Sequence, residues 1–195
     1  MIAGVVLAAG EGRRFGGVKL AAELDGTPVL DHAVTALLAV PAIERIVVVL
    51  GADADVVSSR ADLGSVEAVT CDGWREGIAA SLRAGFAAMA AAEAIVVTLG
   101  DQPLITPQAI AAIVDQADTR EPAVRATYEG RPGHPVLIKR DLFAAVGALR
   151  GDAGARDLLV ASGVRELECG HLCRPDDIDR PEDLERARRR FVETG

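Results

Sequence analysis

Aromatic side chains and cysteines are scarce in this 195-residue chain, and each shortage narrows the classes of protein it can belong to. Only 3% of the residues are Phe, Trp or Tyr although half are apolar, so the core must consist mainly of Ala, Val, Leu and Ile. The three cysteines, Cys71, Cys169 and Cys173, are odd in number and contain no Cys-x-x-Cys pair. They argue against a disulfide scaffold and predict a reducing, cytoplasmic location.

Long apolar runs and an excess of positive charge are also missing. No apolar stretch approaches the ~20 residues that a membrane-spanning helix needs, so no membrane partner is expected. The apolar stretch 2–9 lacks a preceding basic segment and a cleavage-type tail, which favours a buried first strand over a signal peptide. The net charge of −8 is opposite in sign to that of proteins that grip a nucleic-acid backbone, so no nucleic-acid partner is expected.

What the chain does contain is a regular alternation of β-branched apolar runs with Ala- and Leu-rich amphipathic segments, separated by Pro or Gly. This alternation predicts an α/β fold, with a mostly parallel sheet between two layers of helices, in a single domain over 1–195. The predicted strands lie near 3–8, 45–50, 66–70, 94–99, 134–138 and 164–168, and the predicted helices near 28–39, 54–62, 76–92, 108–117, 140–148, 154–161 and from Pro181 onward.

Two helix starts are signalled by a threonine that is followed by a proline. Thr27 precedes Pro28, and Thr106 precedes Pro107. A threonine hydroxyl can cap the free N–H groups of a first turn, and proline fits the first helical position because it has no N–H to lose. Each threonine is therefore predicted to be an N-cap.

A loop rich in glycine and in basic residues follows the first predicted strand, and ligands gather at the carboxyl ends of strands in such sheets. Its four glycines at 10, 12, 16 and 17 let the backbone approach a ligand closely and turn N–H groups toward an anion. Arg13, Arg14 and Lys19 add positive charge to the same loop. The loop predicts a polyphosphate site in an otherwise acidic protein.

The spacing of this loop excludes two familiar phosphate-binding motifs. A Walker A loop needs Lys directly after its last Gly and then Ser or Thr, whereas here Val18 separates Gly17 from Lys19 and Leu20 follows. The dinucleotide fingerprint would place its third glycine one residue before Gly16. The predicted polyphosphate site is therefore neither a P-loop nor an NAD fold.

Two acidic segments supply candidate ligands for a metal ion. Asp101, in Gly100-Asp101-Gln102-Pro103, follows the predicted strand 94–99 and falls at the same edge of the sheet as the glycine-rich loop. Mg²⁺ prefers oxygen ligands and commonly takes one or two carboxylates plus substrate phosphates. The second segment, 176–183, flanks the start of the last helix, where its acids fit both helix capping and metal binding. Both interpretations stay open.

Other catalytic chemistry finds little support in the sequence. The chain has no Gly-x-Ser-x-Gly and no His-Glu-x-x-His motif. Cys169, His171 and Cys173 alternate as they would in a strand, but a zinc site made from them would be one ligand short, so buried side chains are the favoured interpretation. His134 follows a flexible turn and is a candidate contact to substrate.

Six motifs follow one another along the chain: Leu7-Ala8-Ala9-Gly10-x-Gly12-x-Arg14-x-Gly16-x-x-Lys19, Gly77-Ile78-Ala79-Ala80-Ser81-Leu82-Arg83-Ala84-Gly85, Gly100-Asp101-Gln102-Pro103, Gly133-His134-Pro135-Val136, Gly151-Asp152-x-Gly154-x-Arg156 and Asp177-Ile178-Asp179-x-Pro181-Glu182-Asp183. Together they resemble the MobA-like nucleotidyltransferases, and among these the molybdenum cofactor cytidylyltransferases in particular. The resemblance runs almost end to end. It implies a three-layer α/β/α sandwich of the glycosyltransferase-A, or nucleotide-diphospho-sugar transferase, type.

The resemblance also implies roles for individual residues. Arg14, Lys19 and Asp101 would be catalytic, with Arg14 and Lys19 at the β- and γ-phosphates. Asp101 and Asp179 would bind Mg²⁺, and Gly133 and His134 would contact the acceptor. The nucleotide-binding residues would be Leu7, Ala8, Ala9, Gly10, Gly12, Arg14, Lys19, Gly77, Ser81 and Asp101.

The implied reaction is Mg²⁺-dependent transfer of CMP from CTP to molybdopterin with release of pyrophosphate, for delivery to a molybdoenzyme client. The guanylyltransferase branch tends to carry Leu-Ala-Gly-Gly-x-Ser in this loop, so Ala9 and Gly12 favour CTP over GTP. Three alternatives remain open: transfer from GTP, cytidylyl transfer to a sugar or polyol phosphate, and a small-molecule oxidoreductase. The last is included because relatives in the resembled family reduce nicotine-derived pigments.

Overall fold

A seven-stranded sheet runs through the centre of the molecule. The computed structural model describes residues 1–152 and 155–194, the side chains of 191–194 excepted, so Gly154 of the fifth motif lies outside the described residues. The spatial order of the strands is β5-β4-β1-β6-β8-β7-β9. The strands are β1 (Ile2–Ala8), β4 (Ile43–Leu50), β5 (Glu67–Thr70), β6 (Ala94–Leu99), β7 (Ala123–Tyr128), β8 (Arg131–Lys139) and β9 (Val164–Glu168).

Most strand pairs in this sheet are parallel. β1 pairs in parallel with β4 and β6, β4 with β5, and β7 with β9. Only β8 runs antiparallel to its neighbours, β6 and β7. The predicted mostly parallel sheet is confirmed, and β1 and β6 end at the same edge, which is where the glycine-rich loop and Asp101 leave the sheet.

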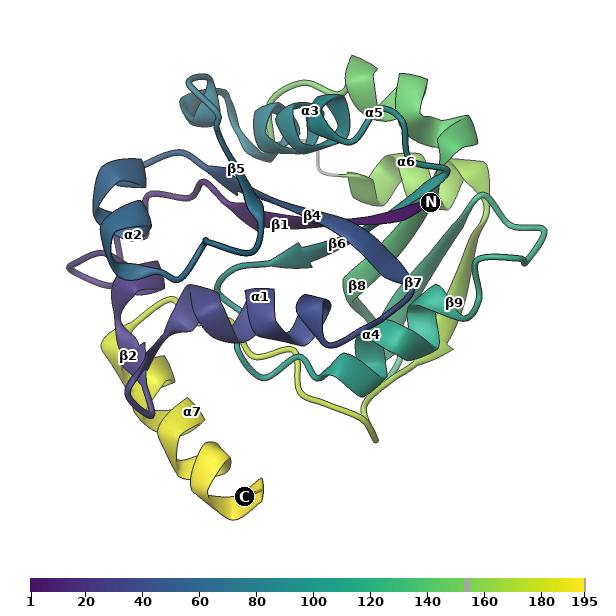
Figure 1. Cartoon of the computed structure of the whole chain (residues 1–195). Helices are drawn as coiled ribbons and strands as arrows, with labels where there is room; N and C mark the ends of the chain where they lie inside the picture. The colour runs from purple at the N-terminus through teal and green to yellow at the C-terminus, as the bar shows by residue number, and fades with distance from the viewer. Residues whose placement is uncertain (153–154, 195) are drawn as a thin grey trace.

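Helices cover both faces of the sheet, as Figure 1 shows. α3 (Ile78–Ala88), α5 (Phe143–Ala148) and α6 (Ala155–Ser162) lie on one face, and α1 (Val29–Leu38) and α4 (Pro107–Val114) on the other. Neighbouring residues of β1 serve opposite faces: Val5 belongs to the apolar cluster that contains Phe86 of α3, and Val6 to the cluster that contains Leu37 of α1. The alternating side chains of a strand buried on both faces produce the continuous apolar runs seen in the sequence.

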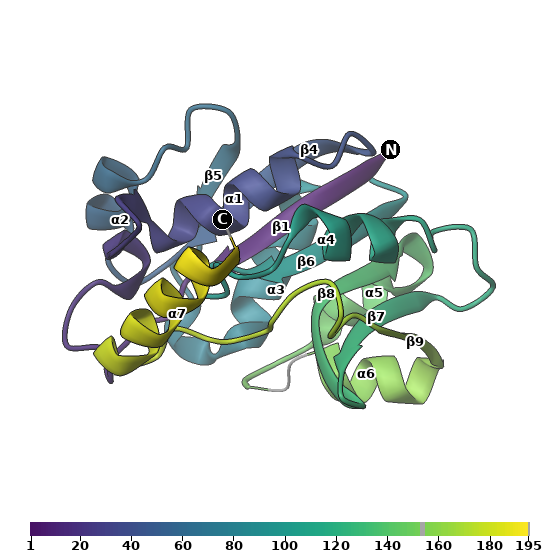
Figure 2. The same cartoon turned by 90° about the horizontal axis from the view of Figure 1, so that it is seen from below.

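Several further elements surround the carboxyl edge of the sheet. α2 (Ala54–Arg60) follows β4, and the short antiparallel pair β2 (Glu23–Leu24) and β3 (Thr27–Pro28) follows a single 3₁₀ turn, η1 (Lys19–Ala21). The final helix, α7 (Pro181–Thr194), extends below α1 in Figure 1 and lies in the foreground of Figure 2, where the molecule is seen from below. It packs on the β2–β3 pair through a small apolar cluster that includes Leu24, Ile178, Leu184 and Ala187.

One of the two predicted proline-marked helix starts is confirmed and the other is wrong. Thr106 caps α4, because its Oγ1 accepts a hydrogen bond from the N–H of Ala109 at 3.3 Å. Thr27 and Pro28 instead form β3, and α1 begins at Val29 with no side-chain cap. The reason is a tight turn at Asp25 and Gly26, both at positive φ, which pairs Leu24 with Thr27. An Asp-Gly pair is a strong hairpin signal, and here it outweighs the capping signal.

The other differences from prediction concern β7, which was not expected, and the helix predicted over 76–92. Residues 74–76 form a separate 3₁₀ turn, η2 (Trp74–Glu76), and α3 begins only after Gly77, whose φ of 107° is unsuited to a helix. A third 3₁₀ turn, η3 (Arg140–Leu142), precedes α5. None of the helices in the described part of the chain is long and apolar enough to cross a bilayer.

Gly85, in the middle of α3, is predicted to be a site where alanine destabilises the fold. A Cβ there would lie 2.6 Å from Cγ1 of Val5, because α3 packs closely on β1. Alanine has the higher helix propensity by about 1 kcal/mol, but overpacking of a core contact costs about 1–3 kcal/mol. We expect Gly85→Ala to lower the free energy of unfolding, as measured by urea denaturation.

Gly147 in α5 is the matched control, since it is also helical and a Cβ there would meet nothing within 4 Å. Gly147→Ala should leave the free energy of unfolding unchanged or raise it by up to about 1 kcal/mol. Equal stability of the two variants would show that α3 does not press against β1 as the structure describes.

Candidate functional site

The glycine-rich loop between β1 and η1 starts from a buried base and then emerges into solvent. The side chains of Leu7, Ala8 and Ala9 are buried, and the N–H of Gly100 donates to the carbonyl of Leu7 at 2.9 Å. From Gly10 onward the loop is mostly exposed. The three predicted nucleotide-binding residues before Gly10 therefore have only backbone groups to offer at this edge, although the Leu7 side chain also lines a neighbouring cavity.

Within the loop the backbone takes conformations that require glycine. Gly12 and Gly16 have φ of 61° and 75°, and the N–H of Phe15 closes a turn onto the carbonyl of Gly12 at 2.9 Å. The N–H groups of residues 10–14 donate no hydrogen bond to any other residue that the structure describes. A run of such free donors is a natural anion-binding surface.

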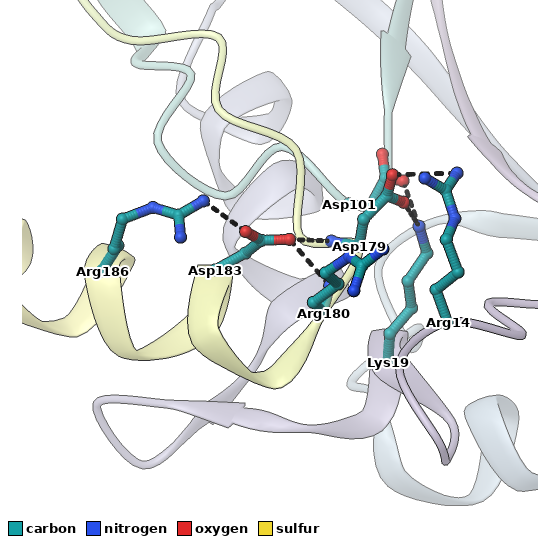
Figure 3. A network of polar contacts seen from close by, with 7 residues as sticks. All are labelled: Arg14, Lys19, Asp101, Asp179, Arg180, Asp183 and Arg186. Carbon is teal, nitrogen blue, oxygen red and sulfur yellow. Dashed lines mark hydrogen bonds and ion pairs between the residues drawn. The ribbon is translucent and has the colours of Figure 1, made fainter.

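Lys19 is the centre of the polar network at this edge. The residue is only 8% exposed, and its Nζ donates to Oδ2 of Asp101 at 2.5 Å and to Oδ1 of Asp179 at 3.1 Å (Figure 3). Burial alone would lower the pKa of Lys19, but the two carboxylates outweigh burial and raise the pKa above its ordinary value. Lys19 is therefore a charged ammonium held between two acids.

Arg14 joins the same network from the exposed part of the loop. One of its terminal nitrogens, Nη2, lies 3.2 Å from Oδ2 of Asp179. The structure thus brings together Arg14, Lys19, Asp101 and Asp179, four residues that the sequence analysis had assigned to catalysis or metal binding. They come from three segments that are far apart in the chain.

A few backbone contacts hold the two acids side by side. The N–H of Ile178 donates to the carbonyl of Asp101 at 2.9 Å, and the Ile178 side chain is fully buried. The carboxylate of Asp183 then accepts from the N–H of Asp179 at 2.9 Å and of Arg180 at 2.7 Å (Figure 3). The acidic segment 176–183 therefore does cap the last helix, through Asp183, and the same cap fixes the backbone of Asp179.

The donor set fits a hard divalent cation. Asp101 and Asp179 already share one cation, the Lys19 ammonium, so their oxygens converge on a common point. No group of three or more His, Cys, Asp and Glu side chains in the described residues could hold a metal ion. A cation bound here would take two carboxylates and draw its remaining ligands from phosphates and water, as Mg²⁺ commonly does.

The start of α3 meets the fifth motif. The N–H of Ala79 donates to the carbonyl of Gly151 at 3.1 Å, and a Cβ on Gly77 would lie 2.5 Å from the same carbonyl oxygen. Ser81, one turn further on, is buried. Gly77 is thus required by the close approach of 151–152, and the structure shows no contact that joins Gly77 or Ser81 to Lys19, Asp101 or Asp179.

A cavity of about 1150 Å³ adjoins the network on the face of the sheet that carries α3 and α6. Gly133 and His134, the predicted acceptor contacts, both line it, as do Gln102 and Asp177 beside the two acids. Burial lowers the pKa of His134 to about 4, with only a small opposing effect from Asp101. His134 is therefore a neutral imidazole at physiological pH.

Gln102 belongs to the motif Gly100-Asp101-Gln102-Pro103, and its side chain has no predicted role. Its Nε2 donates to Oδ1 of Asp177 at 2.8 Å and to the carbonyl of Pro175 at 3.2 Å. The side chain therefore ties the segment before α7 to the turn that carries Asp101. Its position directly after a strand-end carboxylate is the signal that identified Asp101 and could have identified Gln102 as well.

The predicted alternation of Cys169, His171 and Cys173 in a strand is wrong. β9 ends at Glu168, and the N–H of Cys173 donates to the carbonyl of Cys169 at 3.2 Å across a turn. Both cysteines are buried while His171 is exposed, so the three side chains do not share a face. Burial raises the pKa of Cys169 to about 11, which keeps its thiol protonated and disfavours a zinc ligand.

Both the sequence and the fold match known proteins. The family model described as the MobA-like NTP transferase domain matches residues 4–166. The nicotine blue oxidoreductase of Paenarthrobacter nicotinovorans is 31% identical, with 95% of each chain covered. The Rv0371c protein of Mycobacterium tuberculosis, solved in complex with manganese, is 30% identical with a TM-score of 0.78, over 100% of this chain and 99% of that one. A Methanothermobacter nucleotidyl transferase is 26% identical with a TM-score of 0.85, over 100% and 99%.

These matches confirm the predicted α/β/α fold of the nucleotide-diphospho-sugar transferase type. They also include a structure with a divalent metal ion, manganese, bound to a protein 30% identical to this one. The names of the relatives describe more than one activity, a nucleotidyl transferase and an oxidoreductase.

Asp183→Ala is predicted to destabilise the start of α7. Loss of a capping side chain costs about 1 kcal/mol, or roughly 2–4 °C in Tm for a chain of this size. Although burial would raise the pKa of Asp183, its hydrogen bonds from Asp179, Arg180 and Arg186 lower that pKa below its ordinary value. The difference from wild type in thermal denaturation should therefore be complete near neutral pH and vanish as the pH falls through that lowered value.

Glu185→Ala removes another carboxylate from the same helix, one that pairs with Arg188 at the surface. Exposed pairs contribute little, so this control should melt with the wild type. If Asp183→Ala does the same, the cap does not hold the segment that carries Asp179.

Proposed function

Because this chain belongs to the MobA-like NTP transferase domain family, a family of nucleotidyltransferases, we propose that it transfers CMP from CTP to a molybdopterin-type acceptor and releases pyrophosphate. Mg²⁺ is the proposed cofactor, the cytoplasm the proposed location and a molybdoenzyme the proposed client of the product. The proposal treats residues 1–195 as one catalytic domain.

One observation carries the proposal: the ammonium of Lys19 lies between the carboxylates of Asp101 and Asp179, directly beside a loop of free N–H donors. A pair of acids for a metal ion and a set of cations for phosphates thus share one edge of the sheet. In-line transfer of a nucleotidyl group needs both, because two anionic reactants have to be brought together.

The roles follow from this arrangement. Asp101 and Asp179 would hold Mg²⁺, which when bound neutralises charge on the phosphate oxygens. The free N–H groups of the glycine-rich loop would bind the triphosphate, and Arg14 and Lys19 would stabilise negative charge on the departing pyrophosphate. The nucleophile is a terminal phosphate of the acceptor. It is already an anion, so no general base or covalent intermediate is required.

The cavity beside the network supports an acceptor of considerable size. It begins next to Gln102 and extends past Gly133 and His134, the proposed acceptor contacts. The neutral imidazole of His134 adds no charge to the cavity, so it suits an uncharged part of the acceptor. CTP is favoured over GTP by Ala9 and Gly12, which follow the cytidylyl pattern of the loop.

A reductase of a small pigment is the second candidate, because the 31% identical relative is named a nicotine blue oxidoreductase. Such a reaction would need a nicotinamide or flavin cofactor, and the glycine-rich loop does not have the spacing of a dinucleotide-binding fingerprint. Guanylyl transfer and cytidylyl transfer to a sugar or polyol phosphate would use the same edge of the sheet and differ in the pocket for the base or for the acceptor.

Pyrophosphate release in the presence of Mg²⁺, molybdopterin and each of the four nucleoside triphosphates tests the proposed reaction directly. CTP should support release, GTP should support less, and EDTA should abolish it. Asp101→Asn and Asp179→Asn should each lower the rate by roughly 10²–10³, since each removes one of two anionic metal ligands.

Asp115→Asn, an exposed carboxylate at the end of α4, is the control and should react at the wild-type rate. Circular dichroism of each variant separates loss of chemistry from loss of fold. A folded Asp101→Asn protein that releases pyrophosphate normally would remove the metal assignment.

Thermal stabilisation by ligands separates the transferase from the reductase. At ~100 times its dissociation constant a ligand adds about 2.7 kcal/mol to stability, which is roughly 5–10 °C in Tm here. CTP with Mg²⁺ should give a shift of this size, whereas NADH, NADPH and FMN should give little. A larger shift from a reduced nicotinamide or a flavin without metal would favour the reductase. Asp179 would then lose its proposed role as a metal ligand.

A further inference from the structure

Arg125, in β7, is a buried arginine on the floor of the cavity. The proposed reaction gives this residue no role. The residue is 5% exposed, and its Nη2 donates to Oε1 of Glu166 on β9 at 2.5 Å. Its Nε is buried and has no hydrogen-bond partner in the described residues. A buried donor without an acceptor is destabilising, so this nitrogen points to a partner that the chain does not itself supply.

The register of the sheet places Arg125 on the floor of the cavity. Arg125 pairs with Val136 of β8, and Val136 pairs with Val97 of β6, so the three side chains form a row across the same face of the sheet. Val97 and Val136 line the cavity with Arg125, and Ile138 and Leu159 add further apolar surface. The floor is therefore apolar with one polar group in it.

The row that contains Arg125 is well separated from the proposed reaction centre. β6 ends at Leu99, only two residues or about 7 Å beyond Val97, and Asp101 lies in the turn that follows. Arg125 is also displaced sideways from β6 by two strand spacings, about 10 Å. A molecule that reaches from the edge of the sheet to Arg125 must therefore be elongated. Its reacting phosphate and the group that meets Arg125 lie at opposite ends.

The chemistry of Arg125 indicates which group it receives. The Glu166 carboxylate already neutralises the guanidinium charge of Arg125. Its Nε therefore suits a neutral acceptor, such as a carbonyl oxygen or a ring nitrogen, better than a second anion. The apolar floor suits a flat ring. Nearer the reaction centre, the buried Oε1 of Gln102 also has no partner in the described residues and lines the same cavity, which calls for an N–H on the ligand.

We propose that Arg125 is a specificity-determining residue for the acceptor, and that it binds a carbonyl oxygen or ring nitrogen of a planar heterocycle with an amide-type edge. Pterins and purines both have this chemistry. The inference rests on the proposed function, because it takes the cavity to be the acceptor site. It adds the residue that recognises the ring of the acceptor and the kind of ring atom that this residue contacts.

The side-chain Nε–Hε resonance of Arg125 in ¹⁵N-labelled protein is the direct readout, assigned by its absence from Arg125→Met. Pterin, xanthine and inorganic phosphate serve as separate probes, each added to the full chain. Pterin or xanthine should move this resonance, and the probe that moves it more identifies the source of the ring. Arg125→Met should weaken binding of that probe by about tenfold or more, the loss expected for one hydrogen bond to a charged group.

Two further variants keep the test independent of folding defects. Arg125→Lys keeps a positive charge beside Glu166 but has no donor at the Nε position, so it should show the same weakened binding. Arg165→Met removes the neighbouring arginine on the exposed side of β9, outside the cavity lining, and should bind the probe as the wild type does. The proposal is overturned if neither heterocycle moves the Arg125 resonance, if phosphate moves it more, or if Arg125→Met binds normally.

The same experiment distinguishes failure of this inference from failure of the transferase proposal. If a heterocycle moves the Arg125 resonance in a protein that releases no pyrophosphate, the Arg125 assignment stands and cytidylyl transfer is contradicted. If molybdopterin supports pyrophosphate release with the same acceptor KM in wild type and Arg125→Met, the transferase proposal stands and the Arg125 assignment is contradicted. A raised acceptor KM with an unchanged KM for CTP supports both.

Discussion

The ion pairs of Lys19 with Asp101 and Asp179 are the interaction on which the carboxyl edge of this protein depends. They join the loop after β1, the turn after β6 and the segment before α7, and they add to the hydrogen bonds that Ile178 and Gln102 make between the last two regions. A buried ammonium is stable only with acids beside it, and two acids this close repel each other without a cation. The position of α7, and with it the Asp183 cap, therefore depends on charges at the functional edge as well as on the small apolar cluster around Ile178.

Under the proposed function, the molecule divides into an edge that binds the phosphates and a cavity that receives the acceptor. The edge consists of backbone N–H groups and four charged side chains, which any nucleoside triphosphate could use. The cavity over β6, β8 and β7 is lined by apolar as well as polar side chains, whereas the edge is dominated by backbone N–H groups and charged side chains. This separation gives a physical reason why relatives of similar fold carry names as different as nucleotidyl transferase and oxidoreductase. One fold can carry different activities when the residues that line its sites differ.

The sequence predicted the parts of the fold that follow from local patterns of apolar residues and from the position of residues at strand ends. Strands buried on both faces are long apolar runs, so β1, β4 and β6 were visible, and the tendency of ligands to gather at strand ends singled out Asp101. β7 was missed because its run is interrupted by Arg125 and Thr127, polar residues whose partners, Glu166 and Glu168, lie 41 residues away on β9. The pairing of Asp101 with Asp179 came from family resemblance alone, since no local pattern shows that a helix cap will meet a strand end.

In the structure, each cation of the glycine-rich loop is neutralised by an acid of the chain itself. Arg13 pairs with Glu11, Arg14 with Asp179, and Lys19 with both Asp101 and Asp179. Under the proposed function, the acids that hold Arg14 and Lys19 are the ones that a divalent cation would use. Binding of the divalent cation would therefore relieve the repulsion between the two acids in place of Lys19, and would free the positive charge of Arg14 and Lys19 for the triphosphate. By linkage, each of the two ligands must strengthen the binding of the other.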